Sequence, residues 1–368
     1  MKKLTELIPL TATHPGEVLL DELEARAISQ TDFAQQIGLK KSQLNEIIKG
    51  KRNVNAELAL LFEKVLNINA NYWLELQKNY DLDSARIEQK NQHRLEAIEQ
   101  WSLIKDKLSV SFFKKEKIIN GDPVHDIPIV KTIYGVQHLE ELATLYAQPD
   151  YVRFRKSTKL KVNPINLLAW VKLVQYNAVH QKVEVFNYKQ KDELMQSLKK
   201  IITKNKKTLK RVKSTLADYG IKLVYQKKPL QAPVDGISFW SDNNPAIGMS
   251  LRYKRLDNFA FTLFHQLGHI FEHLLNNHKA EFIDLDYKAQ SSAYKKDPIE
   301  KEANQFAEYH LISKDNWKAF YQKNKTYCDN EIIAFAKANK IHPCIVRGKI
   351  SFKRNNYRIR SAIDFEIN

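Results

Sequence analysis

Apolar residues recur at helical spacing along residues 261–273, which read Phe-Thr-Leu-Phe-His-Gln-Leu-Gly-His-Ile-Phe-Glu-His. Apolar positions three and four apart predict a helix with one buried face. Upstream, short β-branched or alternating runs bounded by Pro and Gly predict three strands, at residues 221–225, 236–240 and 246–251. We therefore expect this half of the chain to pack helices against a small antiparallel sheet.

The beginning of the chain shows a second, purely helical pattern. The sequence His-Pro-Gly-Glu opens a predicted helix from His14 to Leu23, and Ser29 is suited to cap the next helix. Gly38 then permits a sharp turn before a third helix. The third helix has a core-facing side formed by Leu44, Ile47 and Ile48.

This arrangement predicts a helix–turn–helix motif that binds double-stranded DNA. Short polar side chains at the start of the second helix of such a motif reach base edges, and flanking Lys and Arg reach phosphates. The candidate DNA-binding residues are Lys40, Lys41, Ser42, Gln43, Asn45, Lys51 and Arg52. A small helical bundle that makes only protein contacts is the alternative.

The stretch from about Thr13 to Leu82 resembles the HigA-like branch of the Xre family of regulators. Both the opening His-Pro-Gly-Glu and the closing Trp-Leu-Glu-Leu-Gln at residues 73–77 match. The resemblance implies an operator as the DNA partner. Because such modules commonly act on two half-sites, we expect a homodimer.

The histidines of the apolar helix have the spacing of metal ligands. His265 and His269 lie four residues apart, so both project from one helix face and can share a metal ion. Glu302 follows His269 by 33 residues, a spacing typical of a third ligand on a second helix. Such a set leaves the fourth position of Zn²⁺ open to water, as in catalytic sites. The same ligands also accept Mn²⁺ or another divalent metal.

Residues from about Tyr219 to Lys353 resemble the ImmA/IrrE family of zinc metallopeptidases. The matching motifs include Asp-Gly-Ile-Ser-Phe-Trp, Asn-Pro-Ala-Ile-Gly, the histidine helix and Glu-Ala-Asn-Gln-Phe-Ala. The resemblance implies that His265, His269 and Glu302 bind zinc. It also places Gln266 where the family has its catalytic Glu.

Gln266 is therefore the one departure at the position of the general base. A Glu there takes a proton from the metal-bound water and returns it to the leaving nitrogen, which an amide cannot do. We expect hydrolysis to be lost or reduced by about 10² to 10⁴-fold. Glu272 lies roughly 10 Å along the helix and is too distant to substitute. Gln266 fits either a natural pseudopeptidase or a deliberately disabled variant, so whether the chain is an enzyme stays open.

The region between the two resemblances is also helical in character. Residues 83–101 are charged and contain no Gly or Pro, which suits a helical connector. The expected organisation is a helix–turn–helix domain at residues 1–82, a connector at 83–180 and a metallopeptidase-like domain at 181–368. The expected fold class is mainly α with a small antiparallel sheet, or α+β. The whole chain resembles fusions of an Xre module with an ImmA/IrrE domain.

The composition of the chain indicates which class of partner and which cellular compartment to expect. The formal net charge of +17 attracts polyanions such as DNA. No apolar run is long enough to span a membrane, and Glu6 and Pro9 interrupt the stretch that a signal peptide needs. Only two cysteines occur, Cys328 and Cys344, without the spacing of a metal site. We expect a cytoplasmic protein.

The combined resemblances imply a DNA-binding regulator whose peptidase domain cleaves a repressor-like or antitoxin-like protein. Such cleavage would relieve repression in stress, toxin–antitoxin or phage responses. The alternative is a non-enzymatic HigA-like antitoxin or repressor whose pseudopeptidase domain senses a ligand or binds a toxin. A third interpretation is DNA binding alone, with an inert C-terminal half.

Overall fold

The computed structural model of the 368-residue chain describes residues 9–145, 162–285, 297–323, 327–358 and 361–368. Internal contacts divide the chain into two compact units, Met1–Trp101 and Ser102–Asn368. Glu6, which was used above against a signal peptide, lies outside the described residues. Within the described parts, no helix is both long enough and apolar enough to cross a membrane.

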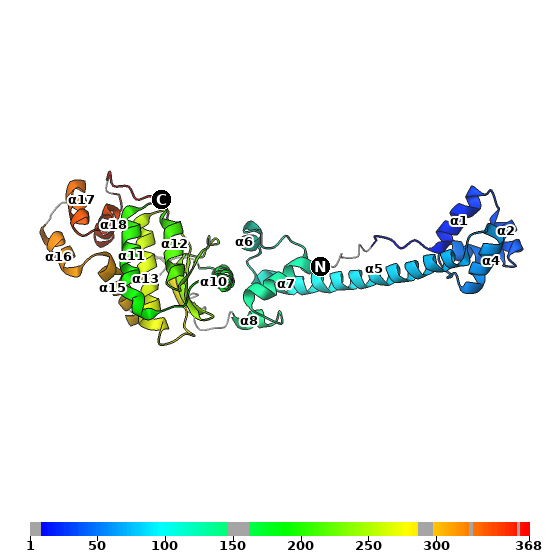
Figure 1. Ribbon diagram of the computed structural model, residues 1–368, viewed down its shortest axis with the longest axis horizontal. Coiled ribbons are helices and arrows are strands. Elements are labelled where there is room, and N and C mark those ends of the chain that lie inside the picture. Colours follow the sequence, from blue (N-terminus) through cyan, green and yellow to red (C-terminus); the bar gives the residue numbers. More distant parts are fainter. Residues whose placement is uncertain (1–8, 146–161, 286–296, 324–326, 359–360) are drawn as a thin grey trace. The chain divides into compact units, whose positions relative to one another are not determined.

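The first unit is entirely helical in its described residues (Figure 1). Its elements are α1 (Pro15–Ala25), α2 (Gln30–Gln36), α3 (Lys41–Ile48), α4 (Ala56–Leu66) and the long α5 (Ala70–Ile104), whose last residues pass into the second unit. Aromatic rings form the centre of its core, where Phe62 lies 5.7 Å from Phe33 and 5.3 Å from Trp73. Leu44 and Ile47 are fully buried, as the helical pattern predicted.

Local capping explains why the first three helices begin and end where they do. The Ser29 hydroxyl accepts the backbone N–H of Asp32 at 3.1 Å and caps α2, as predicted. Gly38 follows with a φ of +68°, which glycine adopts without strain, and it turns the chain into α3. At α1, the cap is His14, whose Nδ1 accepts the backbone N–H of Gly16 at 2.9 Å.

The second unit contains many helices around one sheet. Its helices, in chain order, are η1 (Lys105–Lys107), α6 (Val110–Lys115), α7 (Pro123–Tyr134), α8 (Glu141–Leu145), α10 (Pro164–Val179), η2 (Tyr188–Gln190), α11 (Lys191–Lys204), α12 (Thr208–Asp218), α13 (Leu256–Gly268), η3 (His269–Leu274), α15 (Pro298–Leu311), α16 (Lys314–Lys323), α17 (Asp329–Ala338) and α18 (Pro343–Lys353).

The sheet has four described strands in the order β1-β3-β2-β4. They are β1 (Lys222–Tyr225), β2 (Val234–Ser241), β3 (Asn244–Met249) and β4 (Phe282–Leu285). The α+β fold class is confirmed, but the sheet is mixed rather than antiparallel, because β1 runs parallel to β3. β2 alone runs in the opposite direction to the other described strands, because it is antiparallel to both β3 and β4. The β2–β3 hairpin, however, places β3 between β1 and β2, so β1 pairs with a strand of its own direction.

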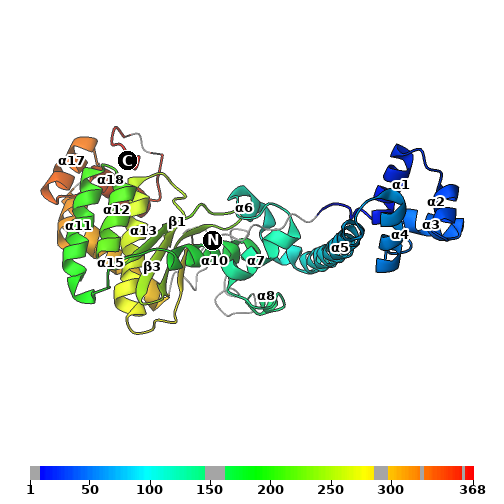
Figure 2. The same cartoon turned by 45° about the vertical axis from the view of Figure 1, so that its right-hand side comes forward.

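Helices cover both faces of this sheet, and α10 and α13 lie on opposite sides (Figure 1, Figure 2). A side chain at Gly248 of β3 would point at Val174 of α10, whereas one at Gly236 of β2 would point at Gln266 of α13. Gly248 pairs with Ile237, the neighbour of Gly236, so the pleat sends the two positions to opposite faces. The α13 face is the one that carries the candidate site.

Candidate metal centre and nucleic-acid interface

Two helices bring the candidate metal ligands together. The histidines at residues 265 and 269 lie at the junction of α13 with the π-helical turn η3, and both are almost completely buried. The facing helix α15 approaches closely at Gly268, where an added Cβ would lie 3.1 Å from the Cα of Ala303. The absence of a side chain at Gly268 therefore allows α15 to place its polar side chains against the histidines.

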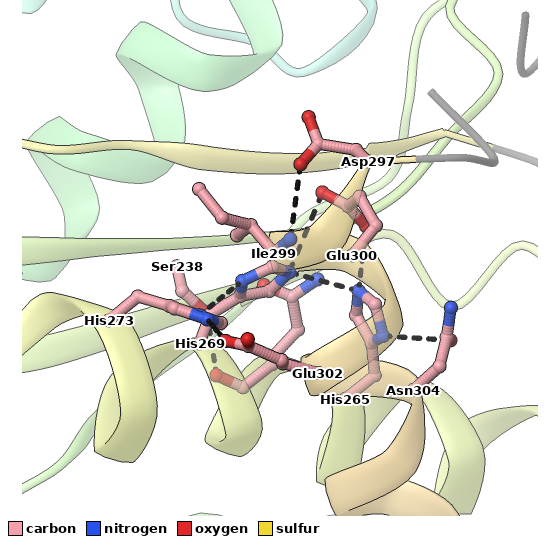
Figure 3. Close-up of polar contacts among 10 residues, drawn as sticks. Ser238, His265, His269, His273, Asp297, Ile299, Glu300, Glu302 and Asn304 are labelled. Carbon is pink, nitrogen blue, oxygen red and sulfur yellow. Dashed lines mark hydrogen bonds and ion pairs between the residues drawn. The ribbon is translucent and has the colours of Figure 1, made fainter. Parts of the chain in front are cut away.

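The resulting cluster consists of His265, His269 and Glu300 (Figure 3). The two Nε2 atoms of the histidines lie 3.0 Å apart. Glu300 Oε2 lies 3.5 Å from His265 Nε2, and Glu300 Oε1 lies 3.8 Å from His269 Nε2. All three residues are buried, so the polar atoms converge on a small space away from bulk water.

The carboxylate of this cluster, its third member, differs from the one expected from the sequence. Glu302 does not join the histidine pair; its Oε2 lies 3.0 Å from His273 Nε2, and its side chain is 60% exposed. Glu300 lies two residues before Glu302 on α15. Because residues two positions apart point to different sides of a helix, Glu300 faces the histidines whereas Glu302 does not. The order of residues in Ile-Glu-Lys-Glu cannot by itself show which Glu faces α13.

Hydrogen bonding around the imidazoles fits a cation at the centre. His265 Nδ1 lies 3.2 Å from Asn304 Oδ1, an acceptor, and His269 Nδ1 lies 3.3 Å from His273 Nδ1. If each Nδ1 carries the proton, both Nε2 lone pairs face each other at 3.0 Å, which is repulsive without a cation between them. Ligands of tetrahedral Zn²⁺ with bonds near 2.0 Å lie about 3.3 Å apart, close to these separations. The donor set therefore fits Zn²⁺.

Burial and charge act differently on the two imidazoles. Burial works to lower the pKa of His265, but the carboxylates of Asp284 and Glu300 raise it above its ordinary value. For His269, burial is the main cause that holds the pKa well below its ordinary value, and the neighbouring imidazoles of His265 and His273 act in the same direction. His269 is consequently neutral at physiological pH, as a metal ligand must be.

Gln266, at the position of the family's general base, is fully buried between α13 and β2. Its Oε1 lies 2.6 Å from Ser238 Oγ, and its backbone oxygen lies 2.9 Å from the same hydroxyl. A Cβ at Gly236 would lie 2.9 Å from Gln266 Nε2, so glycine there makes room for this side chain. The Gln266 amide is thus held by the sheet on the helix of the candidate metal ligands, and an amide cannot accept a proton.

Glu300, Asn304 and Ser238 were not among the site residues predicted from the sequence. A usable signal was present for the first two, because Glu300 and Asn304 are four residues apart, as His265 and His269 are. Residues at this spacing share one helix face, so a ligand and a hydrogen-bond partner can face the same histidine pair. Ser238 had no such signal, since only the tertiary packing places β2 under α13.

The candidate DNA-binding residues lie on and beside α3. Lys40, Lys41, Ser42 and Lys51 are exposed, whereas Gln43, Asn45 and Arg52 are partly buried. Gln43 Oε1 also accepts the backbone N–H of Lys40 at 3.2 Å, which caps α3 and occupies that acceptor. The first 101 residues contain 13 Lys and Arg but 15 Asp and Glu, so the +17 excess belongs to the rest of the chain.

Comparison with protein families gives two matches in separate parts of the chain. Residues 19–73 match the model described as helix-turn-helix. Residues 217–341 match the model described as IrrE N-terminal-like domain, a peptidase family. The expected fusion of the two domains is confirmed.

Characterised relatives cover only a part of the chain. Virulence-associated protein A' of Dichelobacter nodosus is 36% identical over 70 residues, which is 19% of this chain and 61% of that protein. Virulence-associated protein I of the same organism is 31% identical over 83 residues, which is 22% of this chain and 77% of that protein.

Among solved structures, the Pseudomonas aeruginosa antitoxin HigA with the higBA promoter is similar. It is 29% identical, with a TM-score of 0.21, and the match covers 22% of this chain and 89% of that one. These relatives do not span the second unit as a whole.

Proposed function

Because the chain belongs to the helix-turn-helix regulators of the Xre type and carries an IrrE-like domain behind that module, we propose that it is a metal-binding repressor. In this proposal, the first unit binds operator DNA and the second binds one Zn²⁺ through His265, His269 and Glu300. The second unit also engages a protein, as a substrate or as a toxin-like partner. The buried convergence of those three side chains is the observation that carries the proposal.

The chemistry of the centre divides between the metal and the chain. When bound, Zn²⁺ would polarise a water molecule and lower its pKa. The chain's own contribution is to bind the ion with two imidazoles and one carboxylate and to keep the space dry. Gln266 can hold a water by a hydrogen bond, but it cannot take the proton that peptide hydrolysis releases. We therefore propose that this chain binds its protein partner with little or no cleavage.

The hydrogen bonds of Ser238 support a holding role for Gln266. A hydroxyl has a single proton, so Ser238 cannot donate to both the amide and the backbone oxygen of Gln266. With the amide turned over, Nε2 donates to Ser238 while Ser238 donates to the backbone oxygen, so each of the two contacts has one donor and one acceptor. Oε1 then lies at the other end of the amide, beside Gly236.

In a second candidate function, the same fold catalyses no reaction. Gln266 is fully buried and contacts Ser238 and Gly236, so its side chain is part of the packing of the second unit. Such a site suits a non-enzymatic antitoxin or repressor in which the metal holds the second unit together. The two candidates differ only in whether a Glu at position 266 restores hydrolysis.

The DNA-binding part of the proposal rests on α3. Ser42 and Lys41 are exposed near its N-terminal end, where a recognition helix contacts base edges and phosphates. We propose that two copies of the chain bind two half-sites of one operator.

The first experiment is elemental analysis of the full-length protein purified without added zinc or chelator. The proposal expects about one zinc per chain in the wild type and none in His265→Ala. Finding no metal in folded wild-type protein would contradict the metal centre while leaving DNA binding intact.

The second experiment compares wild type with Gln266→Glu on a proteome-derived peptide library and on the intact chain itself. Zinc-dependent cleavage by Gln266→Glu alone, at least 10²-fold above wild type, would establish a peptidase disabled at one residue. Zinc bound without any gain of cleavage would support the non-enzymatic binder. Substantial cleavage by the wild type would contradict both candidates.

A further inference from the structure

A chain of contacts leads from the protein surface to the metal cluster. Glu302 Oε2 lies 3.0 Å from His273 Nε2, and His273 Nδ1 lies 3.3 Å from His269 Nδ1. His269 Nε2 then faces His265 Nε2 at 3.0 Å (Figure 3). In this series, Glu302 and His273 reach the cluster through His269.

We propose that Glu302 and His273 are positioning residues that set the tautomer and ring orientation of the metal ligand His269. The proposal rests on the proposed metal centre, and it assigns to Glu302 a role different from direct coordination. Acceptors behind ligating histidines commonly fix the orientation of the imidazole and raise its basicity.

Proton counting along the chain gives one consistent direction. The Glu302 carboxylate has no proton to donate, so it accepts from His273 Nε2–H. A neutral His273 with its proton on Nε2 has a lone pair on Nδ1, which accepts from His269 Nδ1–H. The lone pair of His269 is then on Nε2, directed at His265 and Glu300, where a metal ligand needs it.

Because His269 is buried, its lone pair on Nε2 depends on the hydrogen bond that its Nδ1–H donates to His273. Its side chain is only 1% exposed, so water does not replace His273 as an acceptor. Without the acceptor at His273, the ring could turn over or shift its proton to Nε2, and either change would remove the lone pair from the cluster.

The other candidate ligand, His265, also has an acceptor behind its Nδ1 atom, but with no residue in between. His265 Nδ1 has its acceptor directly on α15, at Asn304 Oδ1. His269 lies one turn farther along and reaches a carboxylate of the same helix only through the ring of His273. Helix α15 thus supplies the candidate ligand Glu300 and the acceptor Asn304 behind His265. It also supplies Glu302, which contacts His269 through His273.

Packing offers a competing role that the test must separate. The ring of Phe282 stacks on His269 with centroids 4.5 Å apart, and it also lies 5.4 Å from the ring of His273. His273 could therefore matter only as an aromatic wall. His273→Phe keeps an aromatic ring but removes the acceptor, whereas His273→Asn keeps an acceptor near the place of Nδ1 and removes the ring.

The test measures the zinc dissociation constant of the full-length protein by competition with a chelator of known affinity. We expect His273→Phe and Glu302→Ala to weaken zinc binding by about 10- to 100-fold. His273→Asn and Glu302→Gln retain an acceptor and should remain within about threefold of wild type. Glu308→Gln, on the same helix but paired with Lys349, is the matched control and should change nothing.

A second readout does not depend on affinity. In zinc-loaded protein with 15N-labelled histidine, the proposal expects His269 to be protonated on Nδ1 and bound through Nε2. In the apo protein, the same Nδ1 proton should persist in wild type and be lost or exchange between nitrogens in His273→Phe.

The outcomes separate this proposal from the one on which it rests. Wild-type protein without zinc affinity would contradict the metal centre itself. Wild-type affinity retained in His273→Phe and Glu302→Ala would overturn only the positioning role. Weak binding by His273→Asn equal to that of His273→Phe would overturn it in favour of packing. Should a His273 variant fail to fold, the Glu302 pair decides, because that side chain is mostly exposed.

Discussion

Ser238 on β2 and Gln266 on α13 form a buried pair in which a single hydroxyl faces two oxygens of the same residue. The Ser238 Oγ atom lies 2.6 Å from Gln266 Oε1 and 2.9 Å from the Gln266 backbone oxygen. This pair joins the sheet to the helix that carries the candidate metal ligands. It therefore couples the position of Gln266 to the strand register of β2.

Removal of that hydroxyl should destabilise the second unit. We expect Ser238→Ala to lower the free energy of unfolding by about 1–3 kcal/mol, because buried polar groups of Gln266 lose their partner. Denaturant unfolding followed by circular dichroism measures the change. Ser214→Ala, at an exposed position of α12, is the control. An equal effect in both variants would show that the pair contributes nothing.

Closer packing at Gly268 should separate the two ligand-bearing helices. An added Cβ would lie 3.1 Å from both the Cα of Ala303 and the Cβ of Phe306, so α15 must move away from α13. We expect Gly268→Ala to lower stability by about 1–3 kcal/mol and zinc affinity by about tenfold. Chelator competition measures the second effect. Unchanged zinc affinity would mean that Glu300 is not held by this contact.

The first unit has a corresponding contact at Gly16, where a Cβ would lie 1.9 Å from the carbonyl oxygen of Ile47. We expect Gly16→Ala to destabilise this unit by about 1–3 kcal/mol or more and to weaken operator binding in parallel. Gly38→Asn is the control, since nothing lies within 4 Å of an added Cβ and Asn tolerates the left-handed backbone. Similar losses in both variants would contradict the packing argument.

Stability of the second unit should fall as pH rises between about 4 and 7. Burial, and then the charge of Asp284, raise the pKa of Asp235 to about 7 from an ordinary value near 3.8. The folded state therefore binds a proton that the unfolded state has released in this range, and linkage makes unfolding easier with rising pH. Replacement by Asn removes this dependence.

The comparison uses wild type and Asp235→Asn in denaturant at pH 5 and at pH 8. Relative to the variant, wild type should lose on the order of 2–4 kcal/mol over that interval. Asp106→Asn, an exposed position, should follow wild type at both pH values. If Asp235→Asn were stabilised relative to wild type at pH 5 instead of at pH 8, the pH dependence would have the opposite sign and the prediction would be wrong.

Operator binding should separate base contacts from phosphate contacts on α3. We expect Ser42→Ala to cost about 1–3 kcal/mol on a selected operator and to relax its sequence preference. Lys41→Gln should weaken all duplexes alike and reduce the salt slope of binding by about 1. Lys64→Gln, exposed on α4, is the control. Loss of affinity by the control alone would place the DNA on another face.

Several features of the site could be predicted from residues near one another in the chain. The spacing of His265 and His269 placed both on one face of a helix, and Ser29 and Gly38 marked the limits of α2. The motif at residues 265–269 was sufficient to show that an amide, Gln266, follows the first histidine. Each of these predictions depends on local periodicity or capping, which the sequence carries directly.

Other features depended on long-range packing. The strand β4 is four residues long and has no alternating pattern strong enough to be distinguished from a loop. The mixed sheet arises because the β2–β3 hairpin inserts β3 beside β1, which no local signal shows. The contacts of Gln266 with Ser238 and Gly236 likewise join residues about thirty positions apart.

The sequence was sufficient to predict the helix-turn-helix, the shared helix face of the two histidines and an amide at position 266. Local backbone preferences and helix periodicity are sufficient for these. Only the tertiary structure decided that Glu300 joins the histidines while Glu302 meets His273. The reason is that the rotation of α15 about its own axis is set by the close contact at Gly268 with Ala303, and that rotation selects the carboxylate that faces α13.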